Sequence, residues 1–274
     1  MEQYRLVVLD LDGTLTNNKK EITPRTKAAL LRYQEQGGRI VLASGRPTYG
    51  VWPLAKELEL DRYGSYILSF NGAVITECRS GKELFRRELP PGIPALLASM
   101  AREYKTSILT YQGDCICTET PDNIYVQKEV ICTKMKVKKL EDFIRDVDFP
   151  VVKCMMLERG GYLAEVEKKV QARIGKHLSV YRSEPYFLEI MPEGIDKAKS
   201  LRRLLELTGM GTEDMMAFGD GYNDKSMIML AGFGVAMENG QAAVKAVADY
   251  VAPSNEEDGV AYVIEKMLNG ENLG

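Results

Sequence analysis

The chain has 274 residues, with 36 basic and 39 acidic side chains, so its formal net charge is −3. Its composition, 45% hydrophobic and 27% charged, is typical of a folded globular protein and not of a disordered or fibrous chain. The weak negative charge argues against a nucleic-acid-binding surface, and no apolar run is long enough to cross a membrane. We therefore expect neither a nucleic acid nor a membrane as a partner.

The cysteines and the single histidine restrict the possible chemistry. The five cysteines are an odd number, and no charged-then-apolar leader precedes the first hydrophobic strand, so we expect reduced thiols and a cytoplasmic protein. Cys115 and Cys117 have no second pair to complete a zinc site. His177 is expected in a surface loop, so Ser-His-Asp and Cys-His catalysis are not expected. Acid–base chemistry therefore falls to carboxylates, lysines or tyrosines.

The first third of the chain alternates strands and helices. Thr23 and Pro24 are typical of a helix start, and Gly37 of a helix end. The expected elements, in chain order, are a strand at Arg5–Leu9, a helix from Pro24 to Gly37, a strand at Arg39–Ala43, a helix through about Leu60 and a strand at Tyr66–Phe70. This order predicts a doubly wound, Rossmann-like α/β sheet.

The middle of the chain has a different pattern, which favours an inserted α+β domain. Short strands are expected at Ser107–Tyr111, Val151–Leu157 and Leu178–Tyr181, and helices at Pro94–Tyr104 and Tyr162–Ile174. The doubly wound pattern resumes at Asp196, with a helix that begins near Lys197, a strand at Met215–Phe218, a helix over Asp224–Leu230 and a strand at Phe233–Ala236. Further elements are expected at Asp249–Ala252 and Glu256–Leu268. We therefore expect a split core domain, residues 1–84 and 190–274, interrupted by residues 85–189.

Polar clusters follow four of the expected strands: Asp10–Thr14, Ser44–Arg46, Asn71-Gly72 and Gly219–Asp224. In sheets of this class, ligands bind beyond the carboxyl ends of the strands. The four segments are therefore expected to meet at one edge of the sheet.

The first cluster carries two carboxylates two residues apart, at a point where a strand turns into a loop. An aspartate can attack phosphorus and form an acyl phosphate, so Asp10 is a candidate nucleophile. Asp12 could then protonate the leaving group and deprotonate water, while Gly13 would let the backbone approach a phosphate. The alternative is a structural turn, because these residue types are common in turns.

The other clusters could complete such a site. Asp220 and Asp224 resemble half of a Mg²⁺ site, whereas a Ca²⁺-binding EF-hand pattern is absent; a structural turn remains the alternative. Ser44 and Gly45 could hold phosphate oxygens, or Ser44 could simply cap a helix. Lys197 is expected in the first turn of a helix, where a cation is unfavourable unless an anion lies nearby; a solvated lysine is the alternative.

Taken together, these motifs resemble those of the haloacid dehalogenase superfamily, in particular the Cof-type sugar-phosphatase branch with a type IIB cap. Asp10–Thr14, Ser44–Arg46, Lys197 and Gly219–Asp224 correspond to its four motifs in order, and the likeness extends over essentially the whole chain. The family lysine is usually followed by glycine, whereas Ala198 stands here, which suits a helix start.

The resemblance implies roles for individual residues. Asp10 would be the nucleophile and Asp12 the general acid/base. Mg²⁺ would be bound by the carboxylate of Asp10, the backbone carbonyl of Asp12 and Asp220, while Asp224 would orient the metal waters or hold Lys197. The phosphate-binding groups would be those of Leu11, Ser44, Gly45, Lys197 and Asn223.

The resulting hypothesis is a Mg²⁺-dependent phosphomonoesterase that acts on small phosphorylated metabolites, with sugar phosphates expected, through an aspartyl phosphate. The alternatives are a phosphomutase or phosphotransferase of the same fold, a phosphoacceptor signalling domain and an inert metabolite-binding protein. A monomer is expected. The insert contains no readable specificity motif. We expect its Tyr111, Asp114, Tyr125, Lys153 and Arg182 to lie on the surface; the alternative is that they face the site.

Overall fold

The computed structural model describes residues 4–272, which form two compact units. The first unit runs up to Phe85 and resumes at Asp196, and the second is Arg86–Ile195. The first boundary lies one residue after the expected 84/85, and the second lies six residues after the expected 189/190. Each unit has its own sheet and its own buried core.

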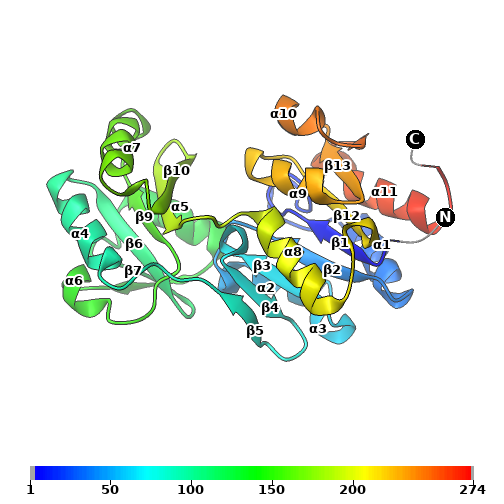
Figure 1. The fold of residues 1–274 in the computed structure, drawn as a ribbon, viewed down its shortest axis with the longest axis horizontal. Helices are drawn as coiled ribbons and strands as arrows, with labels where there is room; N and C mark the ends of the chain where they lie inside the picture. Colours follow the sequence, from blue (N-terminus) through cyan, green and yellow to red (C-terminus); the bar gives the residue numbers. More distant parts are fainter. Residues whose placement is uncertain (1–3, 273–274) are drawn as a thin grey trace. The chain divides into compact units, whose positions relative to one another are not determined.

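The first unit is built on an eight-stranded sheet of order β14-β13-β12-β1-β2-β3-β4-β5 (Figure 1). Its strands are β1 (Leu6–Leu9), β2 (Arg39–Ala43), β3 (Tyr66–Ser69), β4 (Val74–Glu77), β5 (Glu83–Arg86), β12 (Met215–Gly219), β13 (Phe233–Met237) and β14 (Tyr250–Ala252). The six strands from β14 to β3 are parallel, and β4 pairs antiparallel with β3. The chain runs outward from β1 to β3 and returns to β12 on the other side of β1. In open sheets of this class, ligands bind where the strand order reverses, which here is beside β1.

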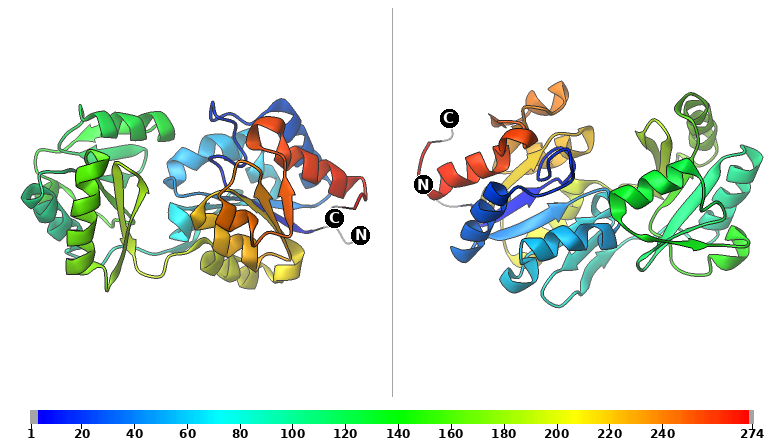
Figure 2. Two further views of the ribbon diagram at one scale, coloured as in Figure 1. Left: turned by 90° about the horizontal axis from the view of Figure 1, so that it is seen from above. Right: turned by 180° about the vertical axis from the view of Figure 1, so that it is seen from behind.

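Helices cover both faces of this sheet (Figure 2). Along β1, Leu6 and Val8 pack into one core and Val7 and Leu9 into the other, and all four are fully buried. The first core contains side chains of α8 (Lys197–Thr208), α9 (Lys225–Leu230) and α10 (Ala242–Lys245), and the second those of α1 (Pro24–Glu35), α2 (Thr48–Glu57) and α11 (Gly259–Leu268). A continuous apolar strand is thus buried on both sides, as parallel sheets require.

The helix signals in the sequence are largely confirmed. Thr23 Oγ1 accepts the N–H of Thr26 at 3.2 Å at the start of α1, and Gly37 follows that helix with a φ of +91°. The helix expected through Leu60 is wrong at its end: α2 stops at Glu57, Glu59 takes a left-handed φ of +54°, and α3 (Leu60–Tyr63) begins separately. No glycine or proline marks this break in the sequence.

The second unit has a six-stranded sheet of order β10-β11-β9-β6-β7-β8, antiparallel in every pair except β7 with β8. The strands are β6 (Ser107–Gln112), β7 (Cys115–Thr118), β8 (Lys136–Lys139), β9 (Cys154–Leu157), β10 (Leu178–Glu184) and β11 (Phe187–Pro192). Its helices are α4 (Ile93–Glu103), α5 (Ile124–Thr133), α6 (Phe143–Asp146) and α7 (Gly160–Ile174). Side chains of α4, α6 and α7 fill the core on one face of the sheet.

Two residues expected on the surface of this unit are buried. Tyr111 donates to Glu129 Oε1 at 2.8 Å, and Lys153 Nζ lies 3.2 Å from Glu189 Oε1; all four side chains are buried. Tyr111 and Glu129 join β6 to α5, so this helix covers part of the face that their side chains occupy. The surface expectation for Tyr111 and Lys153 is therefore wrong, because their polar groups find partners inside the unit.

Other expectations are confirmed. His177 is exposed in the turn after α7, and none of the five cysteines, all of which the structure describes, forms a disulfide. Within residues 4–272, no helix has both the length and the apolar character needed to span a membrane.

The tight contact between Gly72 and α8 is open to a test. Gly72 has a φ of +101°, and an added Cβ would lie 2.5 Å from Ser200 Oγ and 3.3 Å from the carbonyl oxygen of Asp196. Gly72→Ala should therefore lower the free energy of unfolding by about 2–4 kcal/mol, through backbone strain and overpacking. Urea unfolding measures this loss.

Gly81→Ala is the matched control, because Gly81 also has a positive φ, +70°, but has no atom within 4 Å of the added Cβ. Its loss should be about 1 kcal/mol, from backbone strain alone. Equal losses in the two variants would contradict the tight approach of Gly72 to α8.

Candidate active site

Four strands of the first unit end beside one another and carry polar segments at their carboxyl ends. Asp10 follows β1 and donates its N–H to the carbonyl oxygen of Phe218 on β12 at 3.1 Å. Ser44 follows β2, and its carbonyl oxygen accepts the N–H of Asn71 beyond β3 at 2.9 Å. Asp220 directly follows β12. The convergence predicted from the sequence is therefore present.

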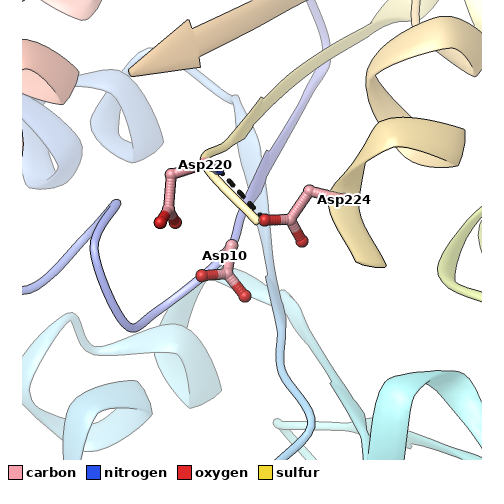
Figure 3. Close-up of side chains that lie close together, drawn as sticks. All are labelled: Asp10, Asp220 and Asp224. Carbon is pink, nitrogen blue, oxygen red and sulfur yellow. Dashed lines mark hydrogen bonds between the residues drawn. The ribbon is translucent and has the colours of Figure 1, made fainter. Parts of the chain in front are cut away.

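Asp10, Asp220 and Asp224 form an acidic cluster (Figure 3), in which one oxygen from each carboxylate lies within 4.8 Å of the others. Thr14 Oγ1 donates to Asp220 at 2.9 Å, and Asp224 Oδ2 accepts the N–H groups of Asp220 and Gly221 at 3.1 and 2.9 Å. The carboxylate that follows β1 and the two carboxylates that follow β12 therefore lie close enough together to bind one ion.

Lys197 lies at the base of this cluster and its side chain is fully buried. Its Nζ donates at 2.6 Å to Asp10 Oδ1, at 2.6 Å to Asp224 Oδ1 and at 2.8 Å to the carbonyl oxygen of Ala43. All three donors of the ammonium group are thus used. Asp196 caps the start of α8 by accepting the N–H of Lys199, so the helix itself fixes the lysine. The solvated lysine considered from the sequence is excluded, and the expected anion beside Lys197 is present.

The charges in the cluster do not balance. Burial, together with the charges of Asp224 and Asp220, raises the pKa of Asp10 to about 8 against the opposing effect of Lys197. Burial also raises the pKa of Asp220 to about 6. The pKa of Lys197 is raised because its two carboxylate partners outweigh its desolvation. With every group ionised, three carboxylates and one ammonium group leave two uncompensated negative charges.

The cluster therefore fits a small divalent cation. Mg²⁺ prefers a few carboxylate oxygens and keeps waters in its remaining positions, and carboxylate oxygens are what this point offers. The double positive charge of the ion would balance the two negative charges of the cluster that Lys197 does not neutralise.

The carboxylate of Asp12 points to different partners. Arg46 holds it with a fork, Nε to Oδ2 at 2.9 Å and Nη2 to Oδ1 at 2.6 Å, and Lys20 Nζ lies 2.7 Å from Oδ1. Burial opposes the ionised form, but Arg46 and Lys20 outweigh it and lower the pKa of Asp12. In the sequence, Arg46 belongs to the Ser44–Arg46 motif, but no role was predicted for its side chain. Lys20 lies in no recognisable motif and was not predicted as a site residue.

The remaining predicted site residues surround the same strand ends. Ser44 is buried and its Oγ accepts the N–H of Arg46 at 3.1 Å. A Cβ on Gly45 would lie 3.2 Å from Asn71 Nδ2, and the exposed Asn223 donates to Asn71 Oδ1 at 3.2 Å. Asn71 therefore joins two of the predicted phosphate-binding segments, a contact that the sequence did not reveal.

Leu11 shapes the loop between the two aspartates. Its side chain is fully buried, and its carbonyl oxygen accepts the N–H and the Oγ1–H of Thr16, each at 2.9 Å. Gly13 follows with a φ of +91°, and a Cβ there would lie 2.5 Å from Asp220 Oδ2. The loop therefore needs glycine to pass so close to Asp220.

Comparison with known proteins identifies the same architecture. A family model described as haloacid dehalogenase-like hydrolase matches residues 7–264. The crystal structure of a haloacid dehalogenase-like hydrolase from Bacteroides thetaiotaomicron is 50% identical, covers 97% of this chain and 100% of that one, and superposes with a TM-score of 0.95. The predicted fold class is confirmed.

Two curated relatives also match along their lengths. The 5-amino-6-(5-phospho-D-ribitylamino)uracil phosphatase YcsE of Bacillus subtilis is 30% identical, and the match covers 95% of this chain and 94% of YcsE. The pyridoxal phosphate phosphatase YbhA of Escherichia coli is also 30% identical, with 96% of this chain and 98% of YbhA covered.

The charge imbalance predicts how stability depends on pH. A carboxyl group whose pKa is raised in the folded state contributes stability below its unfolded pKa, and this is lost as pH rises through the folded value. In EDTA, the free energy of unfolding should fall by about 2 kcal/mol between pH 6 and pH 8 because Asp10 ionises. Urea unfolding at the two pH values measures this.

Mg²⁺ should raise stability at pH 8 more than at pH 6, because it binds the ionised carboxylates. Asp10→Asn should flatten the pH dependence in EDTA. An equal fall in the Asp10→Asn protein would contradict the assignment of this titration to Asp10.

Proposed function

This chain belongs to the haloacid dehalogenase-like hydrolases, and we propose that it is a Mg²⁺-dependent phosphatase that hydrolyses small phosphomonoesters through an aspartyl phosphate. The observation that carries the proposal is the buried carboxylate of Asp10, which Lys197 holds at 2.6 Å beside two further carboxylates. A buried, oriented carboxylate at the carboxyl end of a strand has the placement that a nucleophile toward phosphorus needs.

In the first step, a carboxylate oxygen of Asp10 attacks phosphorus and the bond from phosphorus to the leaving oxygen breaks. Asp12 gives that oxygen the proton that it accepted from water in the preceding turnover, so the alcohol leaves neutral and the phosphoryl group stays on Asp10. Arg46 and Lys20 favour the ionised form of Asp12, and this form is the one left after the proton has been given up. Lys197 lies against Asp10 and offsets negative charge on the phosphoryl oxygens.

In the second step, Asp12 accepts a proton from water as the water oxygen attacks phosphorus. The bond between phosphorus and the oxygen of Asp10 breaks, inorganic phosphate leaves and the carboxylate of Asp10 is restored. One carboxyl group thus serves first as acid and then as base, in a chain whose only histidine is exposed in the other unit.

We infer that Mg²⁺ would be held by the carboxylates of Asp10 and Asp220 and by the backbone carbonyl of Asp12, with Asp224 holding Lys197. When bound, the ion would offset negative charge on the phosphoryl group and on the carboxylates. The phosphate oxygens would contact the backbone of Leu11 and Gly45, the hydroxyl of Ser44 and the amide of Asn223. Lys197 would act on the phosphate through its charge, because its three donors already contact Asp10, Asp224 and the carbonyl oxygen of Ala43.

The substrate class rests on the relatives and on the family resemblance. YcsE and YbhA are named for phosphorylated metabolites of modest size, and the resemblance to Cof-type enzymes adds sugar phosphates. We propose that the second unit selects among such substrates. A monomer in the cytoplasm, without nucleic-acid or membrane partners, remains a prediction.

Asp10→Asn should lower the turnover of p-nitrophenyl phosphate in Mg²⁺ by more than roughly 1,000-fold, because an amide is a poor nucleophile. Release of p-nitrophenol measures it, and circular dichroism checks the fold. Asp61→Asn is the matched control, since Asp61 is a half-buried aspartate of the same unit that is paired with Lys56 and lies outside the acidic cluster. Turnover by Asp10→Asn near that of the control would exclude the nucleophile assignment.

Asp12→Asn should slow the second step and lower the steady-state rate by about 100-fold or more. With p-nitrophenyl phosphate, whose leaving group needs little protonation, rapid mixing should show a burst of p-nitrophenol close to one equivalent of enzyme. Wild-type turnover by this variant would remove Asp12 from the acid–base role. Transfer of the phosphoryl group to a sugar, without accumulation of inorganic phosphate, would favour a phosphomutase instead.

A further inference from the structure

We propose that Arg46 is a positioning residue for this reaction: its guanidinium fork aims the carboxylate of Asp12 toward the leaving group. The inference rests on the proposed function, because it assigns Asp12 to proton transfer. It adds a residue from a different segment of the chain, at the end of β2.

The first argument is the division of partners among the four aspartates of the site. Lys197 contacts Asp10 and Asp224, and Thr14 contacts Asp220. The carboxylate of Asp12 is held instead by Arg46 and Lys20. The orientation of Asp12 is therefore set independently of the cluster that would hold the metal.

The second argument is the rigidity of the fork. Two parallel N–H···O bonds fix the plane of a carboxylate as well as its position, which a single ammonium contact cannot do. The side chain of Arg46 is only 9% exposed, whereas that of Asp12 is 34% exposed. The arginine is thus the better-fixed member of the pair.

The third argument is the backbone that carries Arg46. Its N–H donates to Ser44 Oγ at 3.1 Å, and its carbonyl oxygen accepts the N–H of Phe70 at 2.9 Å. Phe70 has a φ of +50°, a strained conformation for a bulky residue. Such strain persists where the surrounding structure imposes it, and it is typical of functional sites. The strained turn after β3 thus anchors the loop that aims Arg46.

Lys20 provides a contrast within the same site. Its side chain is 49% exposed and makes one contact with Asp12, at 2.7 Å. An exposed single ion pair of this kind contributes little, because solvent screens it and the side chain keeps other rotamers available. If a positive charge beside Asp12 were sufficient, replacing either cation would have the same effect on the reaction. If the orientation of Asp12 matters, only replacement of Arg46 should impair proton transfer.

The test compares two aryl phosphates that share a ring but differ in leaving group, phenyl phosphate and p-nitrophenyl phosphate. The phenolate oxygen is the more basic one and depends more on proton donation as its bond to phosphorus breaks. kcat/KM reports this first step, and the ratio of the two values does not depend on the fraction of folded enzyme. It is measured in Mg²⁺ for wild type, Arg46→Lys, Arg46→Gln, Lys20→Met and Asp12→Asn.

Arg46→Lys and Arg46→Gln should each lower kcat/KM for phenyl phosphate about tenfold more than for p-nitrophenyl phosphate. Lys20→Met should leave the ratio within about threefold of wild type. The ratio for Arg46→Lys combined with Asp12→Asn should equal that for Asp12→Asn alone, since Arg46 acts through Asp12. Inhibition by inorganic phosphate should stay within about threefold of wild type in the Arg46 variants.

Equal losses on the two substrates, together with weaker inhibition by inorganic phosphate, would show that Arg46 binds phosphate and would overturn the inference. A wild-type ratio in both Arg46 variants would overturn it as well. Failure of the proposed function has a different signature: wild-type protein in Mg²⁺ would release no phenol from either ester, and the inference would fall with it.

Discussion

The site depends on one interaction, the burial of Lys197 between Asp10 and Asp224. A buried ammonium group without partners would be strongly unfavourable, as would the two carboxylates without it. Their mutual contact therefore fixes the relative position of β1, the start of α8 and the segment after β12. It also leaves a negative charge that one lysine cannot neutralise, and this residual charge is what makes a divalent cation fit.

The position of much of the candidate site could be predicted from the sequence, because the carboxyl ends of parallel strands lie at one edge of a sheet. Asp10, Ser44 and Asp220 follow apolar strands, so their convergence required only the strand order. The contact of Arg46 with Asp12 could not be predicted in this way, since two side chains from different strand ends leave no periodic signal. The break at Glu59 was missed because its left-handed backbone occurs without glycine.

The second unit was harder to predict for a related reason. Tyr111 and Lys153 are polar residues within the strands expected at Ser107–Tyr111 and Val151–Leu157, a pattern that indicates a solvated face. In the structure Lys153 directly precedes β9. In the structure this face is partly covered by α5, and Glu129 and Glu189 supply the partners. Polar side chains can be buried when they pair with residues that are far away in the sequence. The hydrophobic pattern does not reveal such pairs, so it assigns Tyr111 and Lys153 to the solvent-exposed face instead of the interior. The strands β8 and β11 and the helices α5 and α6 were not predicted.

Lys197 and Asp10 are 187 residues apart in the chain, and the second unit lies between them. During synthesis, β1 to β3 leave the ribosome before α8 is made. The carboxylate of Asp10 therefore has no contact with the ammonium group of Lys197 until α8 has been synthesised. The two buried faces of the first sheet are likewise incomplete until α8, α9 and α11 have been made. The split topology therefore couples completion of the core to completion of the catalytic charge balance, and a chain truncated before Lys197 would lack both.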